Sequence, residues 1–288
     1  MATHVPTQFI IKNEYLTVEI KKLGAELSSV VDKNGTQFIW QAEEVWPRHA
    51  PNLFPVIGSL LDHEYSYNGK IYPLSHHGFA RNIYFDMLHQ SEHSIALVLQ
   101  QNEETLKMYP FRFTLVITYF LDKNNLKQTF RVINNDNTQM PVSFGGHPAF
   151  NANPISEHSI VFETNETNKS NTLQGPYISN IEYDIIKGNT IELNNHIFDN
   201  DALIFQNLDS KTVSLIHSKE KYKVTVDISE FPYLGIWAKP KANYVCIEPW
   251  QGLADFVSHD KKIENKKGIV WIPVNQEIAK SFTLTFEN

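Results

Sequence analysis

The sequence predicts an all-β fold, built as a sandwich or a barrel. Short segments in which apolar and polar residues alternate recur along the 288 residues, and each is bounded by a turn signal. Helical patterns are scarce by comparison. Strands at short, regular spacing with few helices are typical of sandwiches and barrels, because only packed sheets can bury so many one-sided strands.

The strands are predicted from alternation with a period of two. The segment "LTVEI" places Leu16, Val18 and Ile20 on one face of an extended chain. The same pattern recurs in "FTLVITYF" at 113–120, "KVTVDIS" at 223–229 and "SFTLTFE" at 281–287. Turns are expected at "DKNG", "YNGK", "LDKNN" and "NNDN", which are rich in Asn, Asp and Gly.

Only two segments suggest helices. "NEETLKMY" at 102–109 predicts a short helix that Asn102 starts, and "GLADFVSHDKKIE" at 252–264 predicts another small helical piece. The polar stretch "NETNKSNT" at 165–172 is expected to be a surface loop. Because we find no fixed repeat and no linker rich in Pro, Gly or Ser, we expect a single domain over 1–288.

The charge balance of the sequence argues against some classes of binding partner. Lysine and arginine number 25 against 32 aspartates and glutamates, which gives a net charge of −7 without any basic block. We therefore expect neither a nucleic-acid partner nor a membrane surface. The first residues lack the basic and apolar regions of a signal peptide, and the single cysteine, Cys246, excludes an internal disulfide. A cytoplasmic protein is expected, whose oligomeric state the sequence leaves open.

Three segments combine stiff backbone with titratable side chains: "SHHGFAR" at 75–81, "PVSFGGHPAFN" at 141–151 and "YVCIEPWQG" at 244–252. In the last, an extended chain would place Glu248 on one face with Cys246 and Trp250. Desolvation beside an aromatic ring would raise the pKa of that carboxyl, which suits proton transfer near neutral pH. The alternative is a structural salt bridge from Glu248 to Arg81 or Lys239.

The histidines allow catalytic and structural interpretations. His76 and His77 would point in different directions on a strand, so we expect one in a site and the other in solvent. His147 follows two glycines and precedes a proline. The proline would restrict the backbone conformation of His147 and so orient its side chain. Zinc is a competing explanation, but no ligand spacing typical of zinc sites is present. Cys246 lies in an apolar strand and is expected to pack in the hydrophobic core as a small apolar residue.

Aromatic residues accompany these segments. Core packing is the ordinary role of each, but aromatic faces also suit the apolar faces of a sugar ring. The candidates are Phe79, Phe150, Trp237 and Trp250.

Five segments in this order resemble the aldose 1-epimerase (galactose mutarotase) superfamily, and most of all its lactose-operon-associated, mutarotase-related branch. They are "GAEL" at 24–27, "LFPVIG" at 53–58, "HGFAR" at 77–81, "FGGHPAFN" at 144–151 and "IEPWQG" at 247–252. The resemblance covers essentially the whole chain. It implies a large, twisted antiparallel β-sandwich with a sugar site on a concave face, and conversion of sugar anomers without a cofactor.

The resemblance also implies roles for individual residues. Glu248 matches the general base that takes the proton of the anomeric hydroxyl. His147 matches the general acid at the ring oxygen, and His77 the histidine that assists there. Asp201 matches an aspartate that binds sugar hydroxyls. The remaining candidate contacts to a carbohydrate are Arg81, Phe79, Trp237 and Trp250.

Two departures from the family pattern leave the substrate open. The Asn-Arg pair expected before the first histidine motif is missing from "GSLLDHEYSYNG", with Arg81 as the candidate replacement. His147 stands in His-Pro-Ala-Phe instead of His-x-Tyr-Phe. The alternatives are a hexose-6-phosphate mutarotase, with Arg81, Lys239 and Lys241 as candidate phosphate ligands, a non-catalytic carbohydrate-binding protein, and a metal-dependent sugar isomerase.

Overall fold

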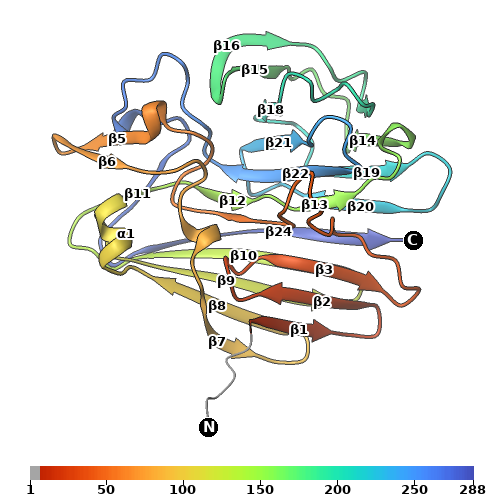
Figure 1. The fold of residues 1–288 in the computed structure, drawn as a ribbon, viewed down its shortest axis with the longest axis horizontal. Coiled ribbons are helices and arrows are strands. Elements are labelled where there is room, and N and C mark those ends of the chain that lie inside the picture. The colour runs from red at the N-terminus through yellow and green to blue at the C-terminus, as the bar shows by residue number, and fades with distance from the viewer. Residues whose placement is uncertain (1–6) are drawn as a thin grey trace.

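The structure, a computed structural model, describes residues 7–288 and is almost entirely β (Figure 1). Residues 1–6, on which the expectation about a signal peptide partly depends, lie outside the described part. None of the helices in the described part is long and apolar enough to cross a membrane. The all-β fold predicted from alternation is confirmed, and it is a sandwich of two large antiparallel sheets.

The first large sheet has nine strands. In spatial order they are β17 (Thr190–Glu192), β14 (His158–Phe162), β19 (Thr212–His217), β20 (Lys223–Asp227), β24 (Glu277–Glu287), β10 (Asn125–Asn134), β9 (Phe113–Asp122), β8 (Ser94–Gln100) and β7 (Asp86–Gln90).

The second large sheet has eight strands and carries the site described below. Its path is β16 (Tyr177–Tyr183), β15 (Ser170–Gln174), β18 (Leu203–Gln206), β21 (Tyr233–Trp237), β22 (Tyr244–Gln251), β12 (Phe144–Gly146) and β4 (Asn52–Leu53), and β13 (Ala149–Asn151) also pairs with β22.

Smaller elements complete the fold. A three-stranded sheet is formed by β1 (Gln8–Lys12), β2 (Leu16–Lys21) and β3 (Leu27–Asp32), and two strand pairs by β5 (Glu64–Tyr67) with β6 (Lys70–Pro73) and β11 (Met140–Val142) with β23 (Val270–Ile272). In the described residues the helical elements are α1 (Glu103–Met108) and four 3₁₀ turns, η1 (Leu61–His63), η2 (Ala80–Asn82), η3 (Ile155–Glu157) and η4 (Ile263–Asn265).

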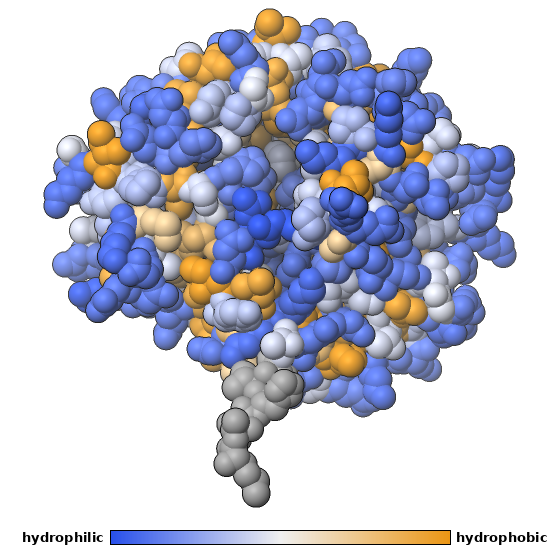
Figure 2. Space-filling view, viewed as in Figure 1, coloured by the Kyte–Doolittle hydropathy of each residue, from blue (hydrophilic) through white to orange (hydrophobic). Residues whose placement is uncertain are grey.

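The main core lies between the two large sheets. Alternate residues of β9 and β24 point into it, as their period predicts, and Leu115, Ile117 and Leu284 are fully buried. Aromatic pairs join the layers: the rings of Phe130 on β10 and Phe144 on β12 lie 5.7 Å apart. Burying such residues contributes about 1.5–3 kcal/mol each. Figure 2 shows that the outside of one face is mostly hydrophilic.

Two local predictions are wrong in part, whereas the helix at 102–109 is confirmed. Asn102 caps α1 by accepting a hydrogen bond from the Thr105 N–H at 2.9 Å. The segment 252–264 contains only the start of η4, because its residues are held by tertiary contacts of Asp255 instead of a helical ladder. The stretch 165–172 is not simply a surface loop: Glu166 is buried, where it accepts the Ser210 N–H, and β15 begins at Ser170.

Candidate active site

A cavity of about 260 Å³ opens on the face of the eight-stranded sheet that is turned away from the main core. Its floor includes a second apolar cluster, to which Ile57, Ile204, Trp250 and Ala254 belong. The volume is slightly below the range of about 300–1,000 Å³ typical of sites for drug-sized ligands. The cavity therefore suits one small molecule.

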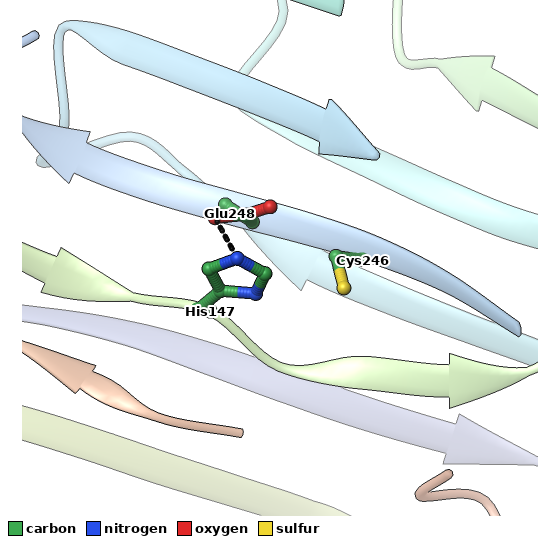
Figure 3. A group of neighbouring side chains, drawn as sticks. All are labelled: His147, Cys246 and Glu248. Atoms are coloured by element: carbon green, nitrogen blue, oxygen red, sulfur yellow. Dashed lines mark ion pairs between the residues drawn. The ribbon is translucent and has the colours of Figure 1, made fainter. Parts of the chain in front are cut away.

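The register of β22 places a carboxyl and an imidazole face to face in this cavity. Gly145 pairs with Trp250 and Ala149 with Cys246, so His147, between β12 and β13, lies opposite Glu248. His147 Nε2 is 3.2 Å from Glu248 Oε2 (Figure 3). Cross-strand neighbours on one face lie close together in any antiparallel pair, which is why residues 101 positions apart in the sequence meet here.

The two glycines before His147 are required by the neighbouring structure. A Cβ at Gly145 would lie 2.5 Å from the Pro249 carbonyl oxygen, and a Cβ at Gly146 would lie 2.6 Å from the Phe282 ring. A side chain at either position would push β12 away from β22 or from the core, so the glycines allow the strand approach that brings His147 to Glu248.

Burial sets the protonation of this pair. Glu248 is 1% exposed, and desolvation raises the pKa of its carboxyl well above the ordinary value, with a smaller contribution from the charge of Asp201. Desolvation lowers the pKa of His147 to about 3. Within residues 7–288, Glu248 Oε2 and His147 Nδ1 are buried and accept or donate no hydrogen bond of normal geometry. The partner of Glu248 is thus His147, and the predicted alternative of a salt bridge to Arg81 or Lys239 is wrong.

His77 completes the group from a turn after β6. Its N–H donates to the Gly58 carbonyl at 2.9 Å, and its Nδ1 accepts the Gly58 N–H at 3.0 Å. Burial first, and then the neighbouring His76 and His147, hold the pKa of His77 well below the usual range. The ring is therefore neutral with its proton on Nε2, and its centroid lies 5.6 Å from that of His147.

The expectation for the histidine pair at 76 and 77 is wrong in part. His76 is exposed as predicted, but both rings line the cavity and their centroids are only 3.8 Å apart. The cause is backbone conformation: the two residues form a turn instead of a strand, and His77 has a φ of 61°. His76 Nδ1 lies 2.8 Å from the hydroxyl of Ser59.

The other predicted contacts are divided between the cavity and the core. Arg81, Asp201, Trp237 and Trp250 line the cavity. Phe79 does not: it is 4% exposed and packs against Phe54, Tyr109 and Phe113, because the chain after Gly78 turns its ring inward. Phe150 is likewise fully buried in the core. Lys239 and Lys241 are not among the residues that line the cavity.

Two residues that the sequence interpretation missed also line the cavity, and both come from the loop between β3 and β4. The Trp46 ring stacks on that of His147 with centroids 5.2 Å apart, and its carbonyl accepts the Trp40 indole N–H at 3.0 Å. Arg48 lies at the cavity and donates to Asn82 Oδ1 at 3.1 Å. The only signal was the short segment "WPRH" at 46–49, which by itself does not indicate a site.

Comparison with known proteins agrees with this geometry. The aldose 1-epimerase family profile matches residues 7–269. The chain belongs to the aldose 1-epimerase family. The plasmid-borne and chromosomal LacX proteins of Lactococcus lactis are both 31% identical to it, over 96% of this chain and 99% of theirs.

Solved structures give the same result. A galactose mutarotase related enzyme from Lactobacillus acidophilus superposes with a TM-score of 0.95 at 35% identity, covering 98% of this chain and 97% of that one. A galactose mutarotase-like protein from Lactobacillus casei gives 0.92 at 31% identity over 97% and 99%. The galactose 1-epimerase from Lactobacillus acidophilus shares the fold, with a TM-score of 0.73 at 13% identity over 98% and 94%. The fold is therefore galactose mutarotase-like, as expected, and the family implies an epimerase with a sugar as its substrate.

Proposed function

We propose that this aldose 1-epimerase family member interconverts the α and β anomers of a hexose by general acid–base catalysis. The observation that carries the proposal is the pairing of His147 and Glu248, 3.2 Å apart in a cavity of monosaccharide size, with His77 beside them. Ring opening of a sugar requires one group that removes a proton and another that supplies one, and both kinds are present here.

Each group has a definite part in the proposed reaction. Glu248 takes the proton of the anomeric hydroxyl while His147 gives a proton to the ring oxygen. The bond between the anomeric carbon and the ring oxygen then breaks and the carbonyl forms. His77 donates a hydrogen bond from Nε2 to the same oxygen, because its Nδ1 is occupied by the Gly58 N–H. After rotation of the aldehyde, closure on its other face returns both protons.

The number of protons carried by His147 and Glu248 suits this reaction. Burial of both groups favours the neutral pair, a carboxylic acid beside an imidazole, whereas the proposed roles use a carboxylate and an imidazolium. The two forms differ only by the position of one proton over a short distance. Sugar hydroxyls supply the hydrogen bonds that stabilise the ionic form when substrate replaces water.

The remaining cavity residues suit a sugar ring. Trp46, Trp237 and Trp250 offer apolar surfaces to its C–H faces. Arg81 and Asp201 offer a donor and an acceptor to its hydroxyls. Asp201 has a φ of 73°, and its Oδ1 accepts the Ala202 N–H at 2.9 Å, so the carboxyl is held at the rim in one orientation.

The direct test follows the optical rotation of freshly dissolved α-glucose and α-galactose with and without the protein. We expect equilibration to become faster in proportion to protein concentration. Equilibration at the rate of buffer for every aldose tried would disprove the proposal. Saturable sugar binding without acceleration would instead identify a carbohydrate-binding protein.

The cavity arginines favour one variant of this function, in which the hexose carries a phosphate. Arg48 and Arg81 both line the cavity, and neither makes a salt bridge within the described residues. Burial, and then the charge of Arg48, lowers the pKa of Arg81 to about 10, and Arg81 Nε is buried without a partner. Arg81 also donates to the His76 carbonyl at 2.7 Å, and Arg48 to Asn82, but neither has a counter-charge in a salt bridge. Two such guanidinium groups that repel each other are well suited to an anionic group.

The phosphate variant is tested by comparing glucose 6-phosphate with glucose. We expect a higher kcat/KM for the phosphate ester, and competitive inhibition by inorganic phosphate that is lost in Arg48→Met and retained in Lys239→Met. Equal kcat/KM for the two sugars and no inhibition by phosphate would leave the free hexose as the substrate.

A further inference from the structure

The proposed reaction does not use the thiol of Cys246, although it lies next to the groups that the reaction does use. Cys246 and Glu248 are two residues apart on β22 and therefore share a face, and His147 lies opposite them (Figure 3). One potential ligand atom from each of the three residues lies within 4.8 Å of the other two. All three side chains are buried.

These three groups are the donor types that zinc prefers. Imidazole, thiolate and carboxylate bind Zn²⁺ at about 2.0–2.3 Å, so ligands of a tetrahedral ion lie about 3.3–3.8 Å from one another. The nitrogen and oxygen of His147 and Glu248 are already 3.2 Å apart. Small side-chain rotations would bring the thiol to the same spacing. Glu248 Oε2 also lacks a well-formed hydrogen bond in the described part of the chain, so its lone pairs are free to bind a cation.

The two acidic groups of this cluster also have no cation beside them. The Cys246 thiol and the Glu248 carboxyl are both buried, so two anions at these neighbouring positions would need a cation to balance them. No lysine or arginine forms a salt bridge with either residue in the described part of the chain. A divalent cation balances one thiolate and one carboxylate, and the neutral imidazole adds no charge.

We propose that His147, Cys246 and Glu248 form a binding site for a thiophilic divalent cation such as Zn²⁺ or Cd²⁺, and that its occupation blocks the acid–base pair. Binding replaces the protons of the thiol and carboxyl and releases up to two protons. His147 and Glu248 line the cavity, so water or a sugar hydroxyl there can take a further coordination position. The hard cations Mg²⁺ and Ca²⁺ are disfavoured by the thiolate. The cation is an inhibitor at this site, so the metal-free protein is the active form.

The binding test uses the thiolate as a reporter. Metal-free protein is titrated with Cd²⁺ while the ultraviolet thiolate-to-cadmium charge-transfer band is recorded. Cys246 is the only cysteine of the chain, so the band reports this site alone. We expect saturation at one equivalent, displacement by Zn²⁺ and no displacement by Mg²⁺. No saturable band would overturn the proposal.

Variants show whether all three ligands take part. His147→Gln and Glu248→Gln should each weaken Cd²⁺ binding by about tenfold or more, at least the loss seen when a residue that only supports a metal ligand is removed. His89→Gln, on the exposed strand β7, is the matched control and should bind as the original chain does. Unchanged affinity in both ligand variants would mean that the thiol binds alone, and the proposal would be wrong. Cys246→Ser should lose the band.

The inhibition test separates this proposal from the proposed function. Zn²⁺ should slow anomer equilibration in competition with the sugar, and a chelator should restore the full rate. Cd²⁺ binding without any mutarotase activity would support the metal site and contradict the proposed function. Mutarotase activity that Zn²⁺ leaves unchanged would contradict the metal site and support the function.

Discussion

Two carboxyl groups, Glu248 and Asp255, lie in this protein with equal burial and opposite chemistry. Each side chain is 1% exposed. Burial raises the pKa of Glu248 well above its ordinary value. Burial also acts to raise the pKa of Asp255, but hydrogen bonds from His259, Lys266 and the Leu61 N–H, together with the charge of Lys266, bring it to about 2.

The difference lies in the partners. Asp255 Oδ1 accepts from the fully buried Lys266 Nζ at 2.8 Å, and Oδ2 accepts the Leu61 N–H at 2.9 Å. Glu248 has no lysine or arginine beside it and faces an imidazole whose own pKa is lowered to about 3. Asp255 is thus fixed as an anion that holds the loop before β5, whereas Glu248 can exchange a proton. Burial makes a carboxyl costly, and its partners decide whether it serves structure or chemistry.

The largest expected effect is on activity in Glu248→Gln. Loss of the proposed general base should reduce kcat/KM for anomer equilibration by about 10²–10⁴-fold. The free energy of unfolding should hardly change, because the amide replaces a carboxyl that burial already favours in its neutral form. Polarimetry and urea unfolding measure the two quantities. A marked loss of stability with activity intact would assign Glu248 a structural role.

Asp255→Asn should show the opposite pattern. The change leaves the Lys266 ammonium buried without a counter-charge, which costs about 3–5 kcal/mol of unfolding free energy. Lys266→Met in the same chain should recover part of that loss, because it removes the unpaired charge. Urea unfolding of the single and double variants measures this. Equal stability of Asp255→Asn and the original chain would contradict the comparison.

The pH dependence of stability should separate the contribution of His147, the partner of Glu248, from that of Asp255. The folded pKa of His147 is lowered to about 3 from an ordinary 6.5, so its contribution to stability is complete above pH 6.5 and is lost as the pH falls toward 3. The slope approaches about 1.4 kcal/mol per pH unit. The Asp255 contribution is present above pH 3.8 and is lost only as the pH falls toward 2.

Urea unfolding at a series of acidic pH values measures that slope. His147→Gln should be less sensitive to pH between 6.5 and 3.8 than the original chain, whereas Asp255→Asn should keep the full slope there. The same slope in His147→Gln and in the original chain would show that His147 is not held neutral.

The smallest expected effect follows removal of the tryptophan over His147. Trp46→Ala admits water to the imidazole, so the pKa of His147 should move upward toward its ordinary value, and KM should rise by a few-fold while the stability falls only slightly. NMR titration of the ring measures the pKa. Trp271→Ala, whose ring packs on Tyr67 elsewhere, is the matched control and should leave the His147 pKa unchanged.

Local sequence patterns predicted the strands well and, in outline, which residues lie together at the cavity. Alternation placed Leu16, Val18 and Ile20 in the core, where they are 0–2% exposed. It also placed Cys246, Glu248 and Trp250 on one face of β22. The turn at His76 and His77 was not predictable in this way, because a contact with Gly58 and a left-handed backbone at His77 override local preference.

The sequence alone determined the all-β class, the buried faces of the strands and the family to which the chain belongs, because these depend on the period of side chains along an extended backbone and on short motifs. The tertiary structure decided that Glu248 faces His147 and not a cation, that Trp46 and Arg48 reach the cavity, and that Phe79 lies in the core. These contacts depend on strand register and loop paths between residues far apart in the chain, which no local pattern encodes.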